Sequence, residues 1–418
     1  MAYRLRSLAA LVMTVLLGSA GVAAQERAPA PAREIETAPP GWSFTPNIAI
    51  GWLYDSNVRL ADPGFNQEPQ DDQLFLFVPS GELMYLGKYS RFVSGYRGTV
   101  LRYRTIDALD TYDQRAWGSL SRRFSPRVTL FGNGSFQHSP TTDDLLLDGV
   151  VFSRTGTEMT NLNGGLDFAV TKATNFHTRY EWISVDFDRE ETRVGVLRAG
   201  RSQGAETEVT HRLNNRFSIG GVYDVRFADI NRGAEGSPLL DPATLQFHNA
   251  GVTAAVELGP ATTLSGAGGI AVLNDSRRPE LSLGPFVRLA LSHQARRASM
   301  KVEYFRMAVP SFGFVVSSMS EGLRGSVAMP VYRNRVYVQA NGYWRRTDPL
   351  EVATFELDTL QGQTTVGVAL ARAVRVEGFY LLSRQDSRPD PRVHPEGGVI
   401  VRHRVGVQLV FGMPMRIQ

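Results

Sequence analysis

The sequence predicts an all-β protein, a transmembrane antiparallel up-and-down β-barrel of about 18 strands, with 16 strands as the alternative. Two observations favour this fold. From Trp42 onward apolar residues recur at every second position, and no helical period persists for more than a turn. The links between these runs alternate in length along the chain, as they do when one end of a barrel carries tight turns.

The first 24 residues have the features of a secretory signal peptide. Arg4 and Arg6 precede an apolar run from Leu8 to Gly21, and small residues at positions 22–24 suit a cleavage site. Residues 25–41 are rich in proline, alanine and charge, so we expect a flexible periplasmic leader. The sequence thus predicts a signal peptide (1–24), a leader (25–41) and an outer-membrane barrel (42–418).

Several runs alternate cleanly between an apolar and a mixed face. Clean runs cover 217–228, 335–346 and 399–411, whereas 91–106 loses the alternation and predicts a bulge. The expected strands are centred near residues 48, 78, 98, 117, 132, 165, 181, 206, 222, 252, 267, 287, 303, 324, 340, 365, 379 and 405. This even number suits a bacterial single-chain barrel.

The links fall into a short and a long class that alternate. The short links lie at 87–90, 125–126, 171–174, 213–215, 259–260, 294–296, 332–334 and 372–373. The longer polar links lie at 61–72, 107–110, 139–157, 188–197, 229–245, 275–280, 309–314, 348–358 and 386–397. Because short turns of such barrels face the periplasm, we expect both termini on the periplasmic side of a bacterial outer membrane.

Composition narrows the classes of function. The chain has no cysteine, which excludes disulfides, thiolate metal sites and a cysteine nucleophile. Its formal net charge of +4 gives no support to nucleic-acid binding. The seven histidines are scattered without metal spacing, so we expect no catalytic, cofactor-binding or metal site and no enzyme. Many of the 40 glycines lie inside the expected strands, where they suit a curved wall.

If the apolar face of each run meets lipid, the opposite face lines the lumen. Acidic and basic residues are interspersed on that face, so a solute-contacting channel and a salt-bridged lining both remain open, and strong ion selectivity is not expected. The candidate pore-lining residues are Asp224, Arg226, Arg288, Lys301, Glu303, Arg324, Arg345, Arg375, Glu377, Arg402 and Arg404. Acidic clusters in the long links, such as Asp143-Asp144, are interpreted as solvated loop tips.

A short motif begins where the first expected strand closes and continues into the second expected strand. It comprises Tyr54, Asp55 and Asn57, followed by Pro79 and Gly81. With these residues the chain resembles outer-membrane β-barrel proteins associated with exopolysaccharide operons, and a related family of β-barrel porins. The step at 55–57 has a second interpretation, a turn out of the strand made by side-chain-to-backbone hydrogen bonds.

The resemblance implies a pore or conduit for export or surface passage of exopolysaccharide. The alternatives are a general diffusion porin for small polar solutes and a structural barrel with a plugged lumen. Expected partners are outer-membrane lipid and lipopolysaccharide, the barrel-insertion machinery during biogenesis, and, from the resemblance, polysaccharide and a periplasmic export protein.

Overall fold

The structure is a computed structural model that describes most of the chain from Pro40 onward. The described residues are 40–61, 68–145, 150–188, 191–192, 195–230, 243–276, 280–313, 317–332, 335–350, 355–389 and 398–417. The expected signal peptide, and the expected leader up to residue 39, lie outside the described residues. Among the described residues, no helix is long and apolar enough to cross a membrane.

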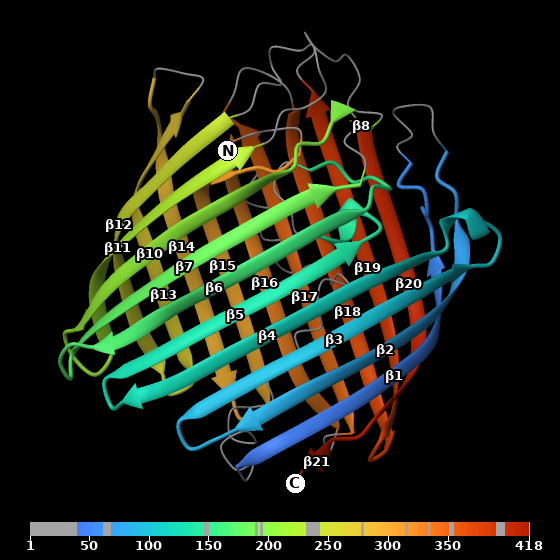
Figure 1. The fold of residues 1–418 in the computed structure, drawn as a ribbon, viewed down its shortest axis with the longest axis horizontal. Coiled ribbons are helices and arrows are strands. Elements are labelled where there is room, and N and C mark those ends of the chain that lie inside the picture. The colour runs from blue at the N-terminus through green and yellow to red at the C-terminus, as the bar shows by residue number, and fades with distance from the viewer. Residues whose placement is uncertain are drawn as a thin grey trace.

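One antiparallel sheet closes on itself and forms a barrel (Figure 1). The sheet has 19 strands, but β21 (Met415–Ile417) only continues β20, so the wall has the predicted 18 strands. The wall strands are β1 (Gly41–Asp55), β2 (Asp72–Leu86), β3 (Ser90–Tyr103), β4 (Thr111–Ser125), β5 (Val128–Ser139), β6 (Thr157–Ala169), β7 (Thr174–Phe187), β10 (Gly200–Arg212), β11 (Phe217–Ile230), β12 (Ala243–Gly259), β13 (Thr262–Asp275), β14 (Ser282–Ala295), β15 (Ala298–Pro310), β16 (Ser317–Tyr332), β17 (Val336–Pro349), β18 (Phe355–Ala371), β19 (Val374–Pro389) and β20 (Gly398–Gly412). Two short strands, β8 (Glu191–Thr192) and β9 (Gly195–Val196), pair with each other in the link between β7 and β10.

The first and last wall strands close the barrel. Ile48 of β1 pairs with Pro79 of β2 on one side and with Phe411 of β20 on the other. β21 extends this seam by pairing with the beginning of β1. Each wall strand therefore pairs with a neighbour on both sides, which is the condition for a sheet to stand in hydrocarbon.

Side chains alternate between the two faces of the wall. On β11, Ile219, Tyr223 and Phe227 are 40–47% exposed, whereas Val222 and Asp224 between them are 4–5% exposed. The exposed face carries large apolar side chains around the wall, as in a membrane-spanning barrel. The bulge expected within 91–106 is wrong, because β3 keeps one register against both of its neighbours.

The links separate by length between the two ends of the barrel (Figure 1). We call the lower end in that view the short-turn end; its turns are residues 87–89, 126–127, 170–173, 213–216, 260–261, 296–297, 333–335 and 372–373. The opposite end is the long-loop end. β1 begins and β20 ends at the short-turn end, so the two ends of the wall lie on one side of the barrel.

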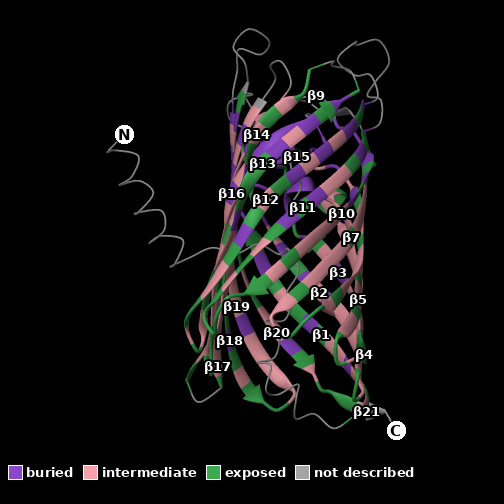
Figure 2. Cartoon of the chain, turned by 90° about the vertical axis from the view of Figure 1, so that its left-hand side faces the viewer, coloured by how far each residue is buried: buried purple, intermediate pink, exposed green. Residues whose placement is uncertain are grey.

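The inner face is not polar throughout. A cluster of buried apolar side chains includes Phe247, Leu273 and Phe286 on β12–β14, together with Phe312 from the β15–β16 link. Figure 2 shows buried residues around β13 and β15 toward the long-loop end. The sequence pattern assigned apolar residues to the lipid face, and this cluster departs from it because segments folded into the barrel supply a second apolar environment.

Candidate pore site: the inner wall and the segments folded into it

The charged side chains of the inner wall are arranged mainly in pairs. Arg226 of β11 lies 2.7 Å from Glu181 of β7, and Arg288 of β14 lies 2.9 Å from Glu206 of β10. On β15, Lys301 lies 3.0 Å from its strand neighbour Glu303. Pairing of this kind keeps a wall hydrated and leaves little net charge along it.

All eleven candidate pore-lining residues lie on the inner face, as the strand registers show. Some of them contact one another: Glu303 also lies 4.0 Å from Arg324, and Arg375 forms an ion pair with Glu377. Asp224 and Arg226 do not bond to each other. Asp224 instead accepts a hydrogen bond of 2.9 Å from Asn249, and Arg226 pairs with Glu181. Whether these residues contact a passing solute stays a prediction.

Glu377 of β19 is the centre of a small hydrogen-bonded cluster. Its carboxylate accepts hydrogen bonds from the Tyr337 hydroxyl, the Arg375 guanidinium and Gln408 Nε2. These three donors come from three strands and satisfy a carboxylate that is almost fully buried. Glu377 is therefore better placed to stiffen the wall than to bind a solute.

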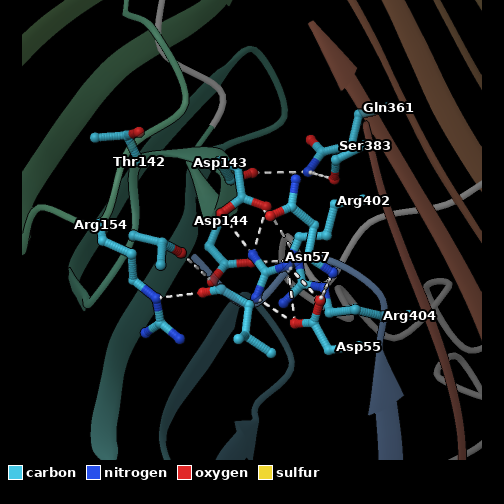
Figure 3. Close-up of polar contacts among 12 residues, drawn as sticks. Asp55, Asn57, Thr142, Asp143, Asp144, Arg154, Gln361, Ser383, Arg402 and Arg404 are labelled. Atoms are coloured by element: carbon cyan, nitrogen blue, oxygen red, sulfur yellow. Dashed lines mark hydrogen bonds and ion pairs between the residues drawn. The ribbon is translucent and has the colours of Figure 1, made fainter. Parts of the chain in front are cut away.

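The link between β5 and β6 folds into the barrel, and its Asp143 and Asp144 approach β20 and the end of β1 (Figure 3). Asp143 and Asp144 from this link meet Arg402 and Arg404 of β20. Arg402 Nη1 donates to Asp143 at 2.7 and 2.9 Å, and its Nη2 and Nε donate to Asp55 at the end of β1 at 2.6–3.1 Å. Arg404 Nη2 donates to Asp144 at 2.7 Å. We call this link the inward loop and these five residues the Asp–Arg network.

Further hydrogen bonds hold the inward loop at other points. Gln361 Nε2 of β18 donates to the carbonyl of Asp143 at 2.7 Å. The amide of Gln385 on β19 bonds the backbone of the loop at Val150 and Phe152, at 3.0 and 2.7 Å. Arg154 Nε donates to the carbonyl of Val58 at 2.7 Å. The loop is thus fixed to β18, β19, β20 and the β1–β2 link at once.

The electrostatics of the inward loop favour the ionised form of Asp144. Burial by itself would raise the pKa of the Asp144 carboxyl. Arg404 and Arg402 lie against that carboxyl, and with a 2.7 Å hydrogen bond from the Thr141 hydroxyl they hold its pKa below the usual value. Asp144 therefore stays charged well below neutral pH.

A second segment enters the barrel from the other side. Phe312, in the β15–β16 link, joins the apolar cluster on the inner face of β12–β14 together with Met319 and Ala308 from the strand ends beside it. Next to Phe312, Gly313 exchanges two backbone hydrogen bonds of 3.1 Å with Arg198, which precedes β10. Links from two places thus fill part of the barrel interior beside β7 and β10–β14.

Two small cavities lie on the inner wall below the inward loop. One has a volume of about 50 Å³ and is bordered by Asp113, Asp144 and Arg404; the other, of about 100 Å³, is bordered by Trp117 and Arg375. Arg97 and Gln408 border both. Among the described residues, no hydrogen bond or ion pair reaches the Arg97 guanidinium. The Arg97 guanidinium therefore has unbonded N–H groups beside the loop, although the Asp113 and Glu377 carboxylates attract it electrostatically.

The motif residues divide between the two faces of the wall. Asp55 accepts the backbone N–H of Asn57 at 3.0 Å, and Asn57 in turn bonds the carbonyls of Ala61 and Val401 through Nδ2. The step at 55–57 thus makes the turn that the sequence suggested, and it also supplies an anion for Arg402. Tyr54, Pro79 and Gly81 lie on the outer face.

Sequence reasoning missed the most buried part of this site. Asp143 and Asp144 are not solvated loop tips but buried partners of wall arginines. Gln361 and Gln385 carried no distinguishing pattern. The only signal in the sequence was a pair of adjacent aspartates in the longest loop and a pair of arginines at alternate positions of β20. Nothing in the sequence indicated that these two pairs are in contact. Among the described residues, no group of three or more His, Asp or Glu is arranged to hold a metal ion.

Comparisons with known proteins return other barrels. The siderophore receptor PirA from Pseudomonas aeruginosa is 10% identical, with a TM-score of 0.43, and the match covers 90% of this chain and 81% of that chain. The FrpB iron transporter from Neisseria meningitidis is 8% identical, with a TM-score of 0.43 and coverage of 91% and 83%. Pseudomonas aeruginosa OpdQ is 9% identical, with a TM-score of 0.42 and coverage of 90% and 99%. The chain matches no protein-family model and no curated protein. The fold assignment rests on the strand pairing itself.

Proposed function

We propose that the protein is an outer-membrane pore for small polar solutes, narrowed toward its long-loop end by the inward loop. The observation that carries the proposal is the contact of Asp143 with Arg402, because it holds a segment of the chain across the interior of a closed 18-strand wall. A barrel of this size has room for an aqueous channel. A loop fixed inside it restricts the size of what passes.

The outer surface supports a place in a membrane. The side chains that point away from the barrel include Trp52, Ile270 and Val407, each more than half exposed, and such a surface requires hydrocarbon around it. In this proposal the short-turn end faces the periplasm, so both ends of the wall lie on the periplasmic side.

The inner wall supports a polar solute. Arg97 offers free N–H donors to the two cavities, and Gln408 and Trp117 offer an amide and an aromatic face beside them. Hydroxyl and carboxylate groups of a small solute bond such donors well. The paired charges elsewhere on the wall provide hydration without a single-sign barrier.

Liposome swelling with a series of sugars of increasing size tests the proposal. We expect the smallest sugars to enter and larger ones to be excluded. A variant in which 141–152 is replaced by a short Gly-Ser linker should admit larger sugars, and a variant shortened at residues 107–109, in a link that does not enter the Asp–Arg network, should keep the native size limit. Absence of permeation by both the native protein and the linker variant would favour the plugged structural barrel.

The motif at the end of β1 favours a second candidate, passage of exopolysaccharide. This role rests on the resemblance carried by Tyr54, Asp55, Asn57, Pro79 and Gly81, and it requires the inward loop to leave its position because a polymer strand needs a wider path. Deletion of the gene with measurement of secreted polymer tests it. If the deletion strain secretes an unchanged amount of polymer but loses uptake of small sugars, the exopolysaccharide role is contradicted and the porin role is supported.

A further inference from the structure

Basic residues gather at the short-turn end of the barrel. The described residues of the eight short turns contain eight Lys or Arg and no Asp or Glu. Seven of the eight turns contain at least one of these basic residues. They are Lys88, Arg127, Lys172, Arg216, Arg296 with Arg297, Arg335 and Arg372. The described residues of the long links show the opposite balance, nine Asp or Glu against four Lys or Arg. We call the basic residues of the short turns the basic rim.

The charges of the basic rim have no oppositely charged partners among the described residues. Every one of its side chains is exposed, and within the part of the chain that the structure describes none forms an ion pair. The inner wall behaves differently, since Arg226, Arg288 and Lys301 each have a carboxylate within 3.0 Å. A ring of like charges without internal partners repels itself, and an external anion relieves that repulsion.

Aromatic side chains beside the basic rim indicate which surface it meets. Lys88 Nζ lies 5.1 Å from the ring centre of the exposed Tyr89, and Arg122 lies 5.1 Å from the ring centre of the exposed Phe124. Phe217 follows Arg216 directly and is exposed. Exposed aromatic residues at the ends of barrel strands lie at the level of the lipid headgroups. Basic side chains next to them therefore lie at the depth where lipid phosphates are found.

We propose that the basic rim binds the phosphate headgroups of anionic phospholipids in the membrane leaflet at the short-turn end. The distribution around the barrel favours lipid over an acidic protein. A protein partner would contact one sector of the end, whereas the basic residues surround it on every turn but 260–261. That exception has the exposed acidic Glu257 beside it, at the end of β12. The proposal concerns the outer circumference of the barrel and does not depend on conduction through it.

The test compares the full-length protein in two kinds of lipid nanodisc. One contains phosphatidylcholine alone, and the other contains phosphatidylcholine with phosphatidylglycerol. The melting temperature of the β-sheet circular dichroism signal is measured in each. Because a ligand that binds only the folded state raises its stability, we expect a higher Tm with phosphatidylglycerol, and high salt should remove the difference.

Two matched variants show whether the rise in Tm depends on the charges of the basic rim or on surface charge in general. R127Q/R216Q/R335Q removes three charges from the short turns, and R59Q/R104Q/R201Q removes three exposed charges near the long-loop end. We expect the first variant to lose the rise in Tm and the second to keep it. The number of phosphatidylglycerol molecules retained per barrel in native mass spectrometry should fall in the first variant alone.

Several outcomes would overturn the proposal. Equal Tm values in the two nanodiscs would do so, as would loss of the rise in both variants. An equal rise with inorganic phosphate in neutral detergent would assign the effect to free anions. An equal rise with soluble polyaspartate would assign the basic rim to an acidic macromolecular partner instead.

Discussion

The carboxylate of Asp143 accepts two hydrogen bonds, of 2.7 and 2.9 Å, from Nη1 of Arg402, although 259 residues separate them in the chain. Both side chains are buried, at 0% and 2% exposure. A buried charge that loses its partner keeps its desolvation cost. Substitution of only one of the two residues should therefore lower the stability of the protein strongly. The position of the inward loop is therefore tied to the integrity of the Asp–Arg network.

Replacement of Asp143 should release the inward loop. We expect Asp143→Ala to lower the free energy of unfolding by about 3–5 kcal/mol, the usual effect of leaving one half of a buried ion pair. The same variant should raise single-channel conductance in planar bilayers. The matched control is Asp110→Ala, which removes the partner of the exposed Arg102 and a hydrogen bond from the Tyr103 backbone N–H, and should cost about 1–2 kcal/mol. Unaltered conductance with a full loss of stability would show that the loop does not narrow the pore.

Acid should release the same loop. The pKa of Asp144 is held below its usual value in the folded protein by Arg404 and Arg402, which outweigh burial. A lowered folded pKa means that the stabilisation is complete above the unfolded pKa and is lost as pH falls through the folded pKa. We expect conductance to rise, and protease cleavage within 141–156 to appear, as the pH falls below the usual aspartate range. Asp144→Asn should show both changes already at neutral pH, and a native protein that stays protected in acid would contradict this.

The sequence predicted the wall of the barrel well because each strand obeys a local rule. Val405 and Val407 face out and Arg402 and Arg404 face in simply because side chains alternate along a strand. The inward loop obeys no local rule. Asp71 and Asp143 lie in long links of similar composition, and Asp71 is exposed whereas Asp143 is buried. The difference arises from a contact across the barrel, and no spacing within one sequence encodes it.

A substitution in the apolar cluster inside the barrel should lower stability about as much as the substitution of Asp143. Phe312 is 5% exposed and packs in the cluster that contains Phe286 and Phe247. We expect Phe312→Ala to cost about 3–5 kcal/mol, because it leaves a cavity where the ring was packed. Thermal unfolding followed by heat-modifiable gel mobility measures this. Leu283→Ala is the control, since Leu283 is 76% exposed on the outer face and should change stability little in lipid. A similar loss in both variants would mean that the cluster is not a packed core.

The glycines inside the strands differ in what they permit, and one pair tests this. A Cβ added to Gly95 of β3 would lie 2.3 Å from the Trp117 ring, whereas one added to Gly118 of β4 would meet nothing closer than a carbonyl oxygen at 3.7 Å. Gly95→Ala must displace a bulky ring on the inner face, so we expect a loss of about 1–3 kcal/mol. Gly118→Ala should be neutral or should stabilise by up to ~1 kcal/mol, because alanine has fewer unfolded conformations to lose. Thermal unfolding of the two variants in the same detergent measures the contrast. Equal losses would show that glycine is needed for the curvature of the wall itself, and an unchanged Gly95→Ala variant would show that Trp117 does not pack on that position.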